Sequence, residues 1–489
     1  FNTALGYDAL LSNTTANCNT AVGTDSLRLN TTGDRNTAIG RSALTANTTG
    51  FRNTALGGKA LCSNTTAPDN MAIGFCAMHS TTTGGDNIAI GNFSLGSNTT
   101  GNNNLALGLS SLCGNTEGCY NHALGRNALR CNTTACNNTA VGYASLCSNT
   151  TGANNTAVGF ESGIAETTAD KNTSVGTYSA YRVTTGGENT FIGYNSGAQN
   201  TTGVQNVGIG SASFGGSTTG SYNTALGACT LYHTNTGNNN VAVGRKALFD
   251  NTSGHDSVAV GNDALTNNTT GEENIAVGIN ALRDTTTAAG SISIGPRAGC
   301  AITTGNNNIA IGRQAASWGG GQLLTTGTEN VHIGYATAQA ASTDSGSMVI
   351  SASGSGAVGK GGSTGFINPN GGGVYQGNNS SSWSTTSDRR IKKNITDNTI
   401  GLDKINQIQV RNFEYRTPEE ITELPKHSAI DKQGVQVGVI AQEIEEILPD
   451  VVKEETTGVK RVDPDNITWY LVNAIKELKK EIDELKQGR

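Results

Sequence analysis

The sequence contains few charged and few aromatic residues, and it lacks long apolar runs. Charged residues make up 14% of the 489 residues and aromatic residues 5%, whereas charged residues average about 25% in globular proteins. No run reaches the roughly 18 apolar residues of a membrane-spanning helix, so no membrane span is expected. The net charge of −6 disfavours broad phosphate binding, and no nucleic-acid partner is expected.

The usual signatures of metal sites are also missing. The ten cysteines form no Cys-x-x-Cys pair, and the six histidines are scattered along the chain. Metal ligands normally come in clusters with short spacings. We therefore predict no metal site and no cofactor.

Glycine is abundant instead, with 65 residues, and it marks a 17-residue repeat. The pentapeptide Asn2–Gly6 recurs as Asn19–Gly23 and Asn36–Gly40, and its glycine stays in register as far as Gly312. After an insertion the pattern returns at Asn330–Gly334. So short a unit cannot bury a core alone, but stacked units can. We predict an all-β parallel solenoid (β-roll) shaft of about twenty-one coils over residues 1–353.

Two apolar positions recur in each unit. The residue before the glycine is aliphatic, as at Leu5 and Val22, and a second apolar residue follows five positions later, as at Leu10. We expect both to point inward as anchors. Ala4 and its equivalents would point the other way in a strand, toward either a neighbouring chain or solvent. A core with two anchors per coil is too thin for one chain, so a homotrimer is expected.

Asn-Thr-Thr runs such as Asn13–Thr15 recur at one phase of the repeat. In-register stacking of identical polar residues predicts ladders. The triplet is also an N-glycosylation acceptor pattern, but its phase favours the ladder. Threonine ladders leave an ice-binding solenoid as an alternative, although these Thr-Thr pairs do not alternate as a flat Thr-x-Thr face would.

Phase also pairs two cysteines, Cys119 and Cys136, which are 17 residues apart. Adjacent coils would bring them within disulfide range. Either a disulfide or a ladder of small buried thiols fits this spacing.

The repeat is irregular in two places. The second anchor becomes Gly163, Ala180 and Gly197 in successive units, where a bend or altered cross-section is expected. A glycine-rich insertion carries Trp318, which fits a surface loop better than a site that stacks on a sugar or partner.

The composition changes toward the C-terminus. Residues 354–386 are rich in glycine and serine and predict a stalk or linker, and charged residues crowd into 387–489. Gly438–Glu443 begins an amphipathic run that Pro449 should end. A coiled-coil helix is predicted by the 4-3 spacing of Leu471, Ile475, Leu478, Ile482 and Leu485.

Two segments resemble known families. The repeats of residues 1–351 resemble the heads of trimeric autotransporter adhesins, which are trimeric left-handed parallel β-rolls. Residues 387–489 resemble the intramolecular chaperone domain at the C-terminus of phage endosialidases and tail spikes, which also occurs in myelin regulatory factors. This second resemblance rests on the run Ser387–Ile395, on Gly438–Glu443, on the Val462-Asp463 step and on the terminal helix.

The second resemblance implies an α/β chaperone domain that is a self-cleaving serine peptidase with a Ser-Lys dyad. By position, Ser387 matches the nucleophile and Lys392 the general base, and the cut falls between Thr386 and Ser387. Asp388 and Arg390 match positions that we interpret as structural. The chemistry is coherent, because a serine hydroxyl needs a nearby base and burial can lower the pKa of a lysine.

Together these features predict a trimeric fibre or tail-spike-like structural or adhesion protein, on a virion or outside a cell. A C-terminal trimer nucleus would set the register of three repetitive chains, which can otherwise pair in many shifted registers. A host-surface glycan or receptor is the expected partner. A bacterial surface adhesin or extracellular filament of the same build is the alternative. The shaft itself is not expected to be an enzyme.

Overall fold

The computed structural model describes residues 1–234, 236–352, 356–368, 374–376, 384–385, 389, 392–417, 419–423, 433–454 and 459–488. The chain forms two compact units, Phe1–Thr386 and Ser387–Arg489. Each unit is described by itself.

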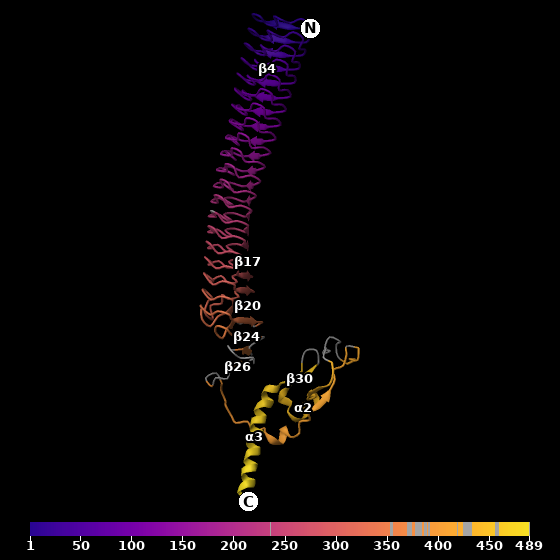
Figure 1. The fold of residues 1–489 in the computed structure, drawn as a ribbon, viewed down its shortest axis with the longest axis vertical. Coiled ribbons are helices and arrows are strands. Elements are labelled where there is room, and N and C mark those ends of the chain that lie inside the picture. Colours follow the sequence, from indigo (N-terminus) through magenta and orange to yellow (C-terminus); the bar gives the residue numbers. More distant parts are fainter. Residues whose placement is uncertain are drawn as a thin grey trace. The chain divides into compact units, whose positions relative to one another are not determined.

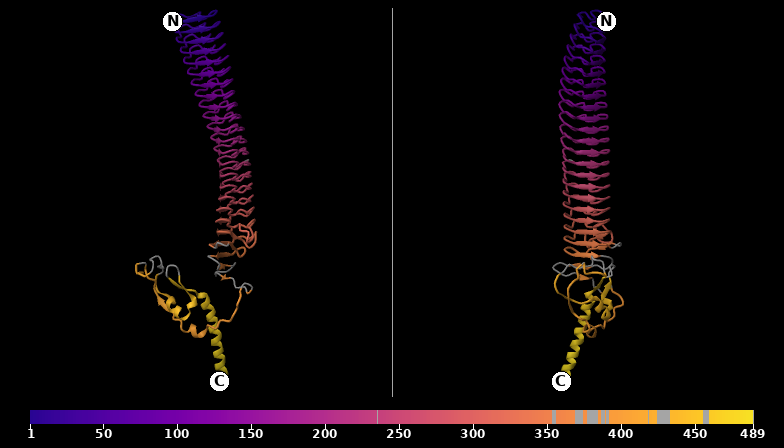
Figure 2. Two further views of the ribbon diagram at one scale, coloured as in Figure 1. Left: turned by 180° about the vertical axis from the view of Figure 1, so that it is seen from behind. Right: turned by 90° about the vertical axis from the view of Figure 1, so that its right-hand side faces the viewer.

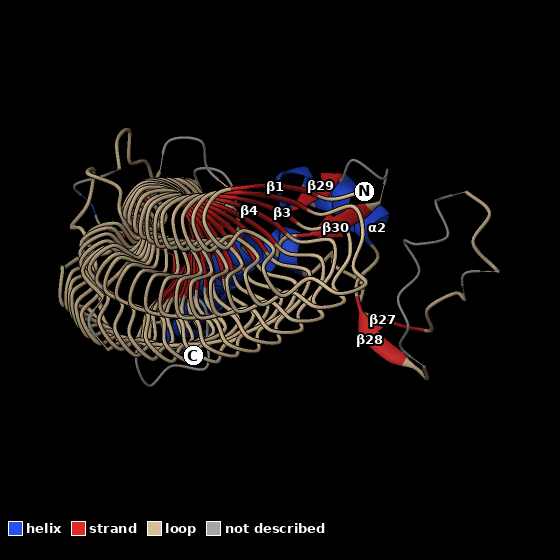
Figure 3. Ribbon diagram, turned by 90° about the horizontal axis from the view of Figure 1, so that it is seen from above, coloured by secondary structure: helices blue, strands red, loops and turns tan. Residues whose placement is uncertain are grey.

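The first unit is a parallel β-solenoid of about 21 turns, which confirms the predicted fold of the shaft. Each coil contributes one short strand, and each strand pairs in parallel with the next at the same phase, as Ala4 does with Ala21. The strands stack along one side of the coils and turns close the other side (Figures 1, 2 and 3). The strands are β1 (Thr3–Leu5), β2 (Thr20–Val22), β3 (Thr37–Ile39), β4 (Thr54–Leu56), β5 (Met71–Ile73), β6 (Ile88–Ile90), β7 (Leu105–Leu107), β8 (His122–Leu124), β9 (Thr139–Val141), β10 (Thr156–Val158), β11 (Thr173–Val175), β12 (Thr190–Ile192), β13 (Val207–Ile209), β14 (Thr224–Leu226), β15 (Val241–Val243), β16 (Val258–Val260), β17 (Ile275–Val277), β18 (Ile292–Ile294), β19 (Ile309–Ile311) and β20 (Val331–Gly334).

Strand pairing continues beyond residue 353, into the segment predicted as a stalk. β20 pairs in parallel with β22 (Met348–Ser351), and β22 with β24 (Gly365–Asn368). Two antiparallel strands follow, β25 (Val374–Gln376) and β26 (Ser384–Thr385). A small second sheet joins β21 (Thr337–Ala338) to β23 (Ala357–Val358).

The first predicted anchor does not point inward. In the strands from β2 to β19 the middle residue is buried and its two neighbours are partly or fully exposed: Ala38 has no exposed surface, whereas Ile39 is 39% exposed. Ala38 and its equivalents therefore face neither solvent nor another chain, which corrects both predictions. The alanine points inward because the interior of so small a coil has room for only a methyl group between the strand and the second anchor.

The second anchor is buried as predicted, and its backbone is left-handed. Leu27, Leu44 and Leu61 have no exposed surface and φ values between 47° and 52°. Side chains branched at Cβ are strongly disfavoured in this region. This explains why the position carries Leu, Met, Phe, Ala or Gly but never Val or Ile, from Leu10 to Ala316.

Buried asparagines form two ladders along the shaft. In one ladder the side-chain oxygen of Asn19 accepts the backbone N–H of Asn36 at 2.8 Å, and the side-chain amide of Asn19 donates to the carbonyl of Gly33 at 2.9 Å. In the other, the side-chain amide of Asn47 donates to the side-chain oxygen of Asn30 at 2.7 Å. Asn30 and Asn47 begin Asn-Thr-Thr runs and are fully buried, which supports the ladder rather than glycosylation.

Where the second anchor is lost, neighbouring side chains fill its volume. A Cβ at Gly163 would lie 2.9 Å from Oε1 of Glu166, and a Cβ at Gly197 would lie 2.4 Å from the ring of Phe191. Glu166 and Phe191 are both buried. The strands keep their register here, with Phe191 opposite Gly208.

The second unit has a small core beneath a long terminal helix. The core includes Ile444, Leu448, Val451 and Tyr470. Pro449 follows the second helix and begins a 3-10 turn, as its position in the sequence predicted. The elements are α1 (Leu402–Ile405), β27 (Arg411–Phe413), β28 (Gln436–Gly438), α2 (Ala441–Ile447), η3 (Pro449–Val451), β29 (Val452–Glu454), β30 (Lys460–Val462) and α3 (Pro464–Gln487).

Candidate functional site

The predicted scissile bond joins the two compact units, which meet between Thr386 and Ser387. Thr386, Ser387, Asp388 and Arg390 lie outside the described residues, so their roles stay predictions. The last described strand before the bond is β26, which ends at Thr385.

Lys392, the predicted base, is described and exposed. Its backbone N–H donates a hydrogen bond to the carbonyl of Arg389 at 3.2 Å. This unit by itself leaves the Lys392 side chain exposed.

The other predicted motifs hold the second unit together. Glu443, at the start of α2, accepts two hydrogen bonds from the guanidinium of Arg411 on β27, both at 3.1 Å. Asp463 caps α3 by accepting the backbone N–H of Asp465 at 3.1 Å. The first contact joins α2 to β27 and the second caps the start of α3, so we assign both motifs structural roles.

An apolar seam runs along α3 and has no partner among the described residues of the chain. The predicted heptad residues all lie on this helix, and their side chains are 42% to 72% exposed. An adjacent side of the helix contributes Tyr470 and Ala474 to the interior of the unit. The seam residues are Leu471, Ile475, Leu478, Ile482 and Leu485.

A second apolar surface runs along the outer face of the solenoid sheet. The third residue of every strand from β1 to β19 is Leu, Ile or Val. Ile39, Leu56 and Ile90 are 38% to 44% exposed. We call this row of third residues the aliphatic stripe. It is the row that the sequence had predicted to point inward.

A glutamic acid and a histidine, Glu166 and His332, are buried in the described part of the shaft, and sequence reasoning missed both. Burial raises the pKa of Glu166 to about 8, and the nearby amide of Asn172 offsets this only in part. Neither carboxyl oxygen has a hydrogen-bond partner within bonding geometry among the described residues. Burial lowers the pKa of His332 to about 4, and its Nδ1 lies 3.1 Å from the hydroxyl oxygen of Thr337. Glu166 is therefore protonated and His332 neutral near pH 7.

The paired cysteines lie on adjacent coils, as their spacing predicted. The backbone N–H of Cys119 donates to Sγ of Cys136 at 3.1 Å. Both residues are half-buried free thiols in this structure. The disulfide stays a prediction.

An aromatic groove on the turns of the shaft was also missed. Tyr178, Tyr181, Tyr194 and Tyr232 line it, and they come from three coils. Comparing residues 17 positions apart would have revealed this cluster. Trp318, which the sequence singled out, is half-buried, and its indole packs close to Gly356.

The described residues contain no group of three or more His, Cys, Asp or Glu side chains placed to hold a metal ion. Among the helices described here, none is both long and apolar enough to cross a membrane.

Residues 387–453 match the model of a protein family described as chaperone of endosialidase. No curated protein and no solved structure matches the chain. The resemblance of the C-terminal segment to this chaperone family is thus confirmed, with a long solenoid before it. A β-solenoid shaft joined to such a segment fits a tail-fibre-like protein with an intramolecular chaperone.

Proposed function

We propose that the chain is one subunit of a trimeric fibre or tail spike, located on a virion or outside a cell. Residues 387–489 direct assembly of the trimer and then cut the chain between Thr386 and Ser387. The shaft is structural or adhesive, and its partner is a glycan or receptor on a host surface. The family match carries the chaperone and cleavage parts of this proposal.

The seam on α3 supports assembly through the C-terminal unit. Aliphatic side chains repeating every 3.5 residues pack between parallel helices. An isolated helix of 24 residues gains most of its stability from packing against other elements. A row of five exposed aliphatic side chains therefore marks a surface that packs against a partner. Three copies of α3 would cover the seam.

The aliphatic stripe supports assembly along the shaft. Sheet faces that expose an aliphatic row over many strands normally pack against another surface. Each strand presents the same outward residue type at the same phase, so three copies can pack with their coils level. Identical coils also permit packing that is shifted by one unit, and a C-terminal nucleus would prevent this.

The proposed cleavage uses Ser387 and Lys392. The amine of Lys392 accepts the proton of Ser387 Oγ, and Oγ attacks the carbonyl carbon of Thr386. The amide nitrogen of Ser387 leaves as an amine after it gains a proton, and water then hydrolyses the ester. Because Lys392 is exposed in the single chain, we infer that contact with another copy buries it and makes cleavage follow assembly.

Self-cleavage is tested on a denaturing gel of the full chain beside Ser387→Ala. The wild type is expected to give fragments 1–386 and 387–489, and the variant a single intact chain, because it lacks the nucleophile. Lys393→Ala is the matched control, since this neighbouring lysine has the wrong spacing and should still permit cleavage. If wild type and Ser387→Ala migrate identically, self-cleavage is refuted.

Assembly is tested by introducing a charge into the seam. Ile475→Glu places a carboxylate between packed helices, where an unpaired charge is costly, and it is expected to reduce the trimer to monomer in sedimentation. Lys476→Glu introduces the same residue one position away, outside the heptad row, and should leave the trimer intact. Both are measured with Ser387→Ala, so that α3 stays attached. A trimer that survives Ile475→Glu would show that the seam is not the interface.

A further inference from the structure

The groove lies where the 17-residue pattern is most altered. Its lining residues come from five successive coils, from Glu161 in the first to His233 in the fifth. These are the coils around Gly163 and Gly197, where the second anchor is missing. Neighbouring side chains fill the core of these coils. Packing inside the shaft therefore does not explain why the surface residues of these coils also depart from the repeat.

One column of side chains gives the groove its length. The fifth residue after the corner glycine is Tyr181, Ala198, Gly215 and Tyr232 on four successive coils. Successive parallel strands lie about 4.8 Å apart, so the two tyrosines are separated by roughly 14 Å. Ala198 and Gly215 are buried and form a low floor between them. The groove has a volume of about 590 Å³, within the range of small-molecule sites.

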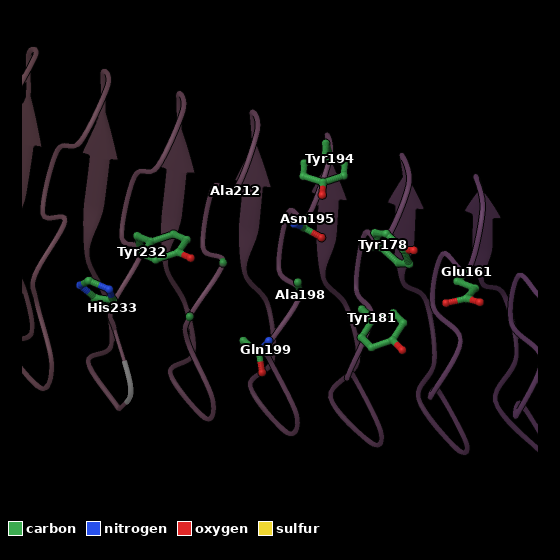
Figure 4. Close-up of a pocket in the computed structure, with 12 residues that line it drawn as sticks. Glu161, Tyr178, Tyr181, Tyr194, Asn195, Ala198, Gln199, Ala212, Tyr232 and His233 are labelled. Atoms are coloured by element: carbon green, nitrogen blue, oxygen red, sulfur yellow. The ribbon is translucent and has the colours of Figure 1, made fainter.

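The aromatic rings are held by their neighbours. Tyr178 contacts Tyr181 and Tyr194 edge-on, with ring centroids 5.4 Å and 6.3 Å apart. At the other end Tyr232 stacks on Phe249, with centroids 5.3 Å apart and planes inclined by 7°. Figure 4 shows the rings on the turn segments rather than on the strands. The groove therefore does not use the aliphatic stripe.

Two amide side chains that are partly accessible to solvent also line the groove. Asn195 and Gln199 line the groove, and their side-chain amides have no hydrogen-bond partner among the described residues. The ladder asparagines, in contrast, bond to the next coil. Each amide offers two donors and an acceptor to a ligand in the groove.

The charge of the groove is slightly negative. Glu161 is the one carboxylate among the lining residues, and no lysine or arginine lines the groove within the described chain. His233 is paired through Nδ1 with Asp250 at 2.8 Å. An anionic ligand would meet no compensating cation here.

We propose that this groove binds a neutral oligosaccharide. The apolar faces of sugar rings would pack on Tyr181, Tyr194 and Tyr232, and sugar hydroxyls would bond to the amides of Asn195 and Gln199. A mixed lining of partly exposed aromatic rings and amides without a bonded neighbour suits sugars, which are themselves apolar on one face and polar at the edges. The inference rests on the proposed role of the shaft as a surface-contacting fibre, and it gives the chemical class of the partner.

The test is binding of the labelled full chain to immobilised neutral oligosaccharides and to matched sialylated ones. The wild type should bind at least one neutral glycan. Tyr232→Ala removes a ring, and Ala198→Phe fills the floor, so each should weaken binding by about tenfold or more. Tyr222→Ala is the matched control, because Tyr222 is 56% exposed, like Tyr194 at 54%, but lies outside the groove; it should bind like wild type.

Three results would overturn the inference. They are absence of binding to every neutral glycan, binding that Tyr232→Ala and Ala198→Phe leave unchanged, and binding to sialylated glycans alone. Loss of the trimer in sedimentation of the groove variants would instead identify the groove as an interface between copies. The groove variants should still cut at Ser387 on the denaturing gel, so failure of sugar binding is distinguishable from failure of the proposed self-cleavage.

Discussion

Replacing Glu166 by glutamine is expected to raise the thermal unfolding midpoint of the shaft at about pH 8 and to leave it nearly unchanged at about pH 4. The carboxyl group is fully buried and lacks hydrogen-bond partners within the described chain. Burial raises its pKa from an ordinary 4.5 to about 8. The folded shaft therefore retains a proton that the unfolded chain releases.

The direction of the pH dependence follows from these two pKa values. The wild-type carboxyl makes its full contribution to stability below pH 4.5, and this contribution is lost as the pH rises through about 8. The loss corresponds to roughly 4–5 kcal/mol, since each tenfold change in proton affinity is worth 1.36 kcal/mol. Glutamine keeps the shape and has no proton to release, so the free energy of unfolding should lose this pH dependence.

Circular dichroism melts of the full chain at several pH values measure the effect. Glu188→Gln is the control, because Glu188 is exposed and bonded to Lys171 at 2.9 Å; its melts should keep the wild-type fall in midpoint between pH 4.5 and 8. If the midpoints of Glu166→Gln and wild type fall in parallel between pH 4.5 and 8, the buried carboxyl is not the cause.

Replacing Gly57 by alanine is expected to open the stack around β4 and β5. Gly57 turns the chain after the strand with φ at 137°, and a Cβ there would lie 2.5 Å from the carbonyl oxygen of Gly74 in the next coil. Both the backbone strain and the overlap oppose the substitution, with an expected cost of at least about 3 kcal/mol. Contacts in a solenoid link nearest neighbours, so amide hydrogen exchange should rise in these strands first.

The adjacent Gly58 provides the control. A Cβ at Gly58 would meet only the ring of Phe75, at an ordinary 3.5 Å. Gly58→Ala should therefore change stability by less than about 1 kcal/mol, and hydrogen exchange of β4 should resemble wild type. Equal exchange in Gly57→Ala and Gly58→Ala would contradict the role given to the corner glycine.

The stacking of the coils could be predicted because it depends only on the position of each residue within the 17-residue repeat. A 17-residue spacing places Thr3 beside Thr20 whatever the interior looks like. The direction of the side chains could not be predicted in the same way, because Leu5 and Val22 are more apolar than the alanine beside them. The available signal was variation: Leu, Ile and Val exchange freely at the outward position, whereas Ala is nearly constant at the confined one.

The sites were less predictable. The spacing of Ser387 and Lys392 predicts a dyad by resemblance, but the exposure of the lysine depends on which surfaces surround it. Glu166 occupies a ladder position normally held by asparagine. Its longer side chain fits because Gly163 carries no side chain, and the sequence does not show that these two residues are in contact. The groove depends on residues 17 positions apart becoming neighbours, which requires the stack first.

Because each coil bonds only to the coils beside it, the shaft can be lengthened or shortened by whole units. Duplication or loss of 17 codons inside a regular stretch would shift its reach by about 4.8 Å while leaving every junction chemically the same. Recombination between near-identical repeats offers a direct route to such changes. The number of coils then sets the length of the shaft, and selection can act on that length. The irregular coils around Gly163 and Gly197 are not interchangeable with the regular ones, so exchanges that include them would change the shaft.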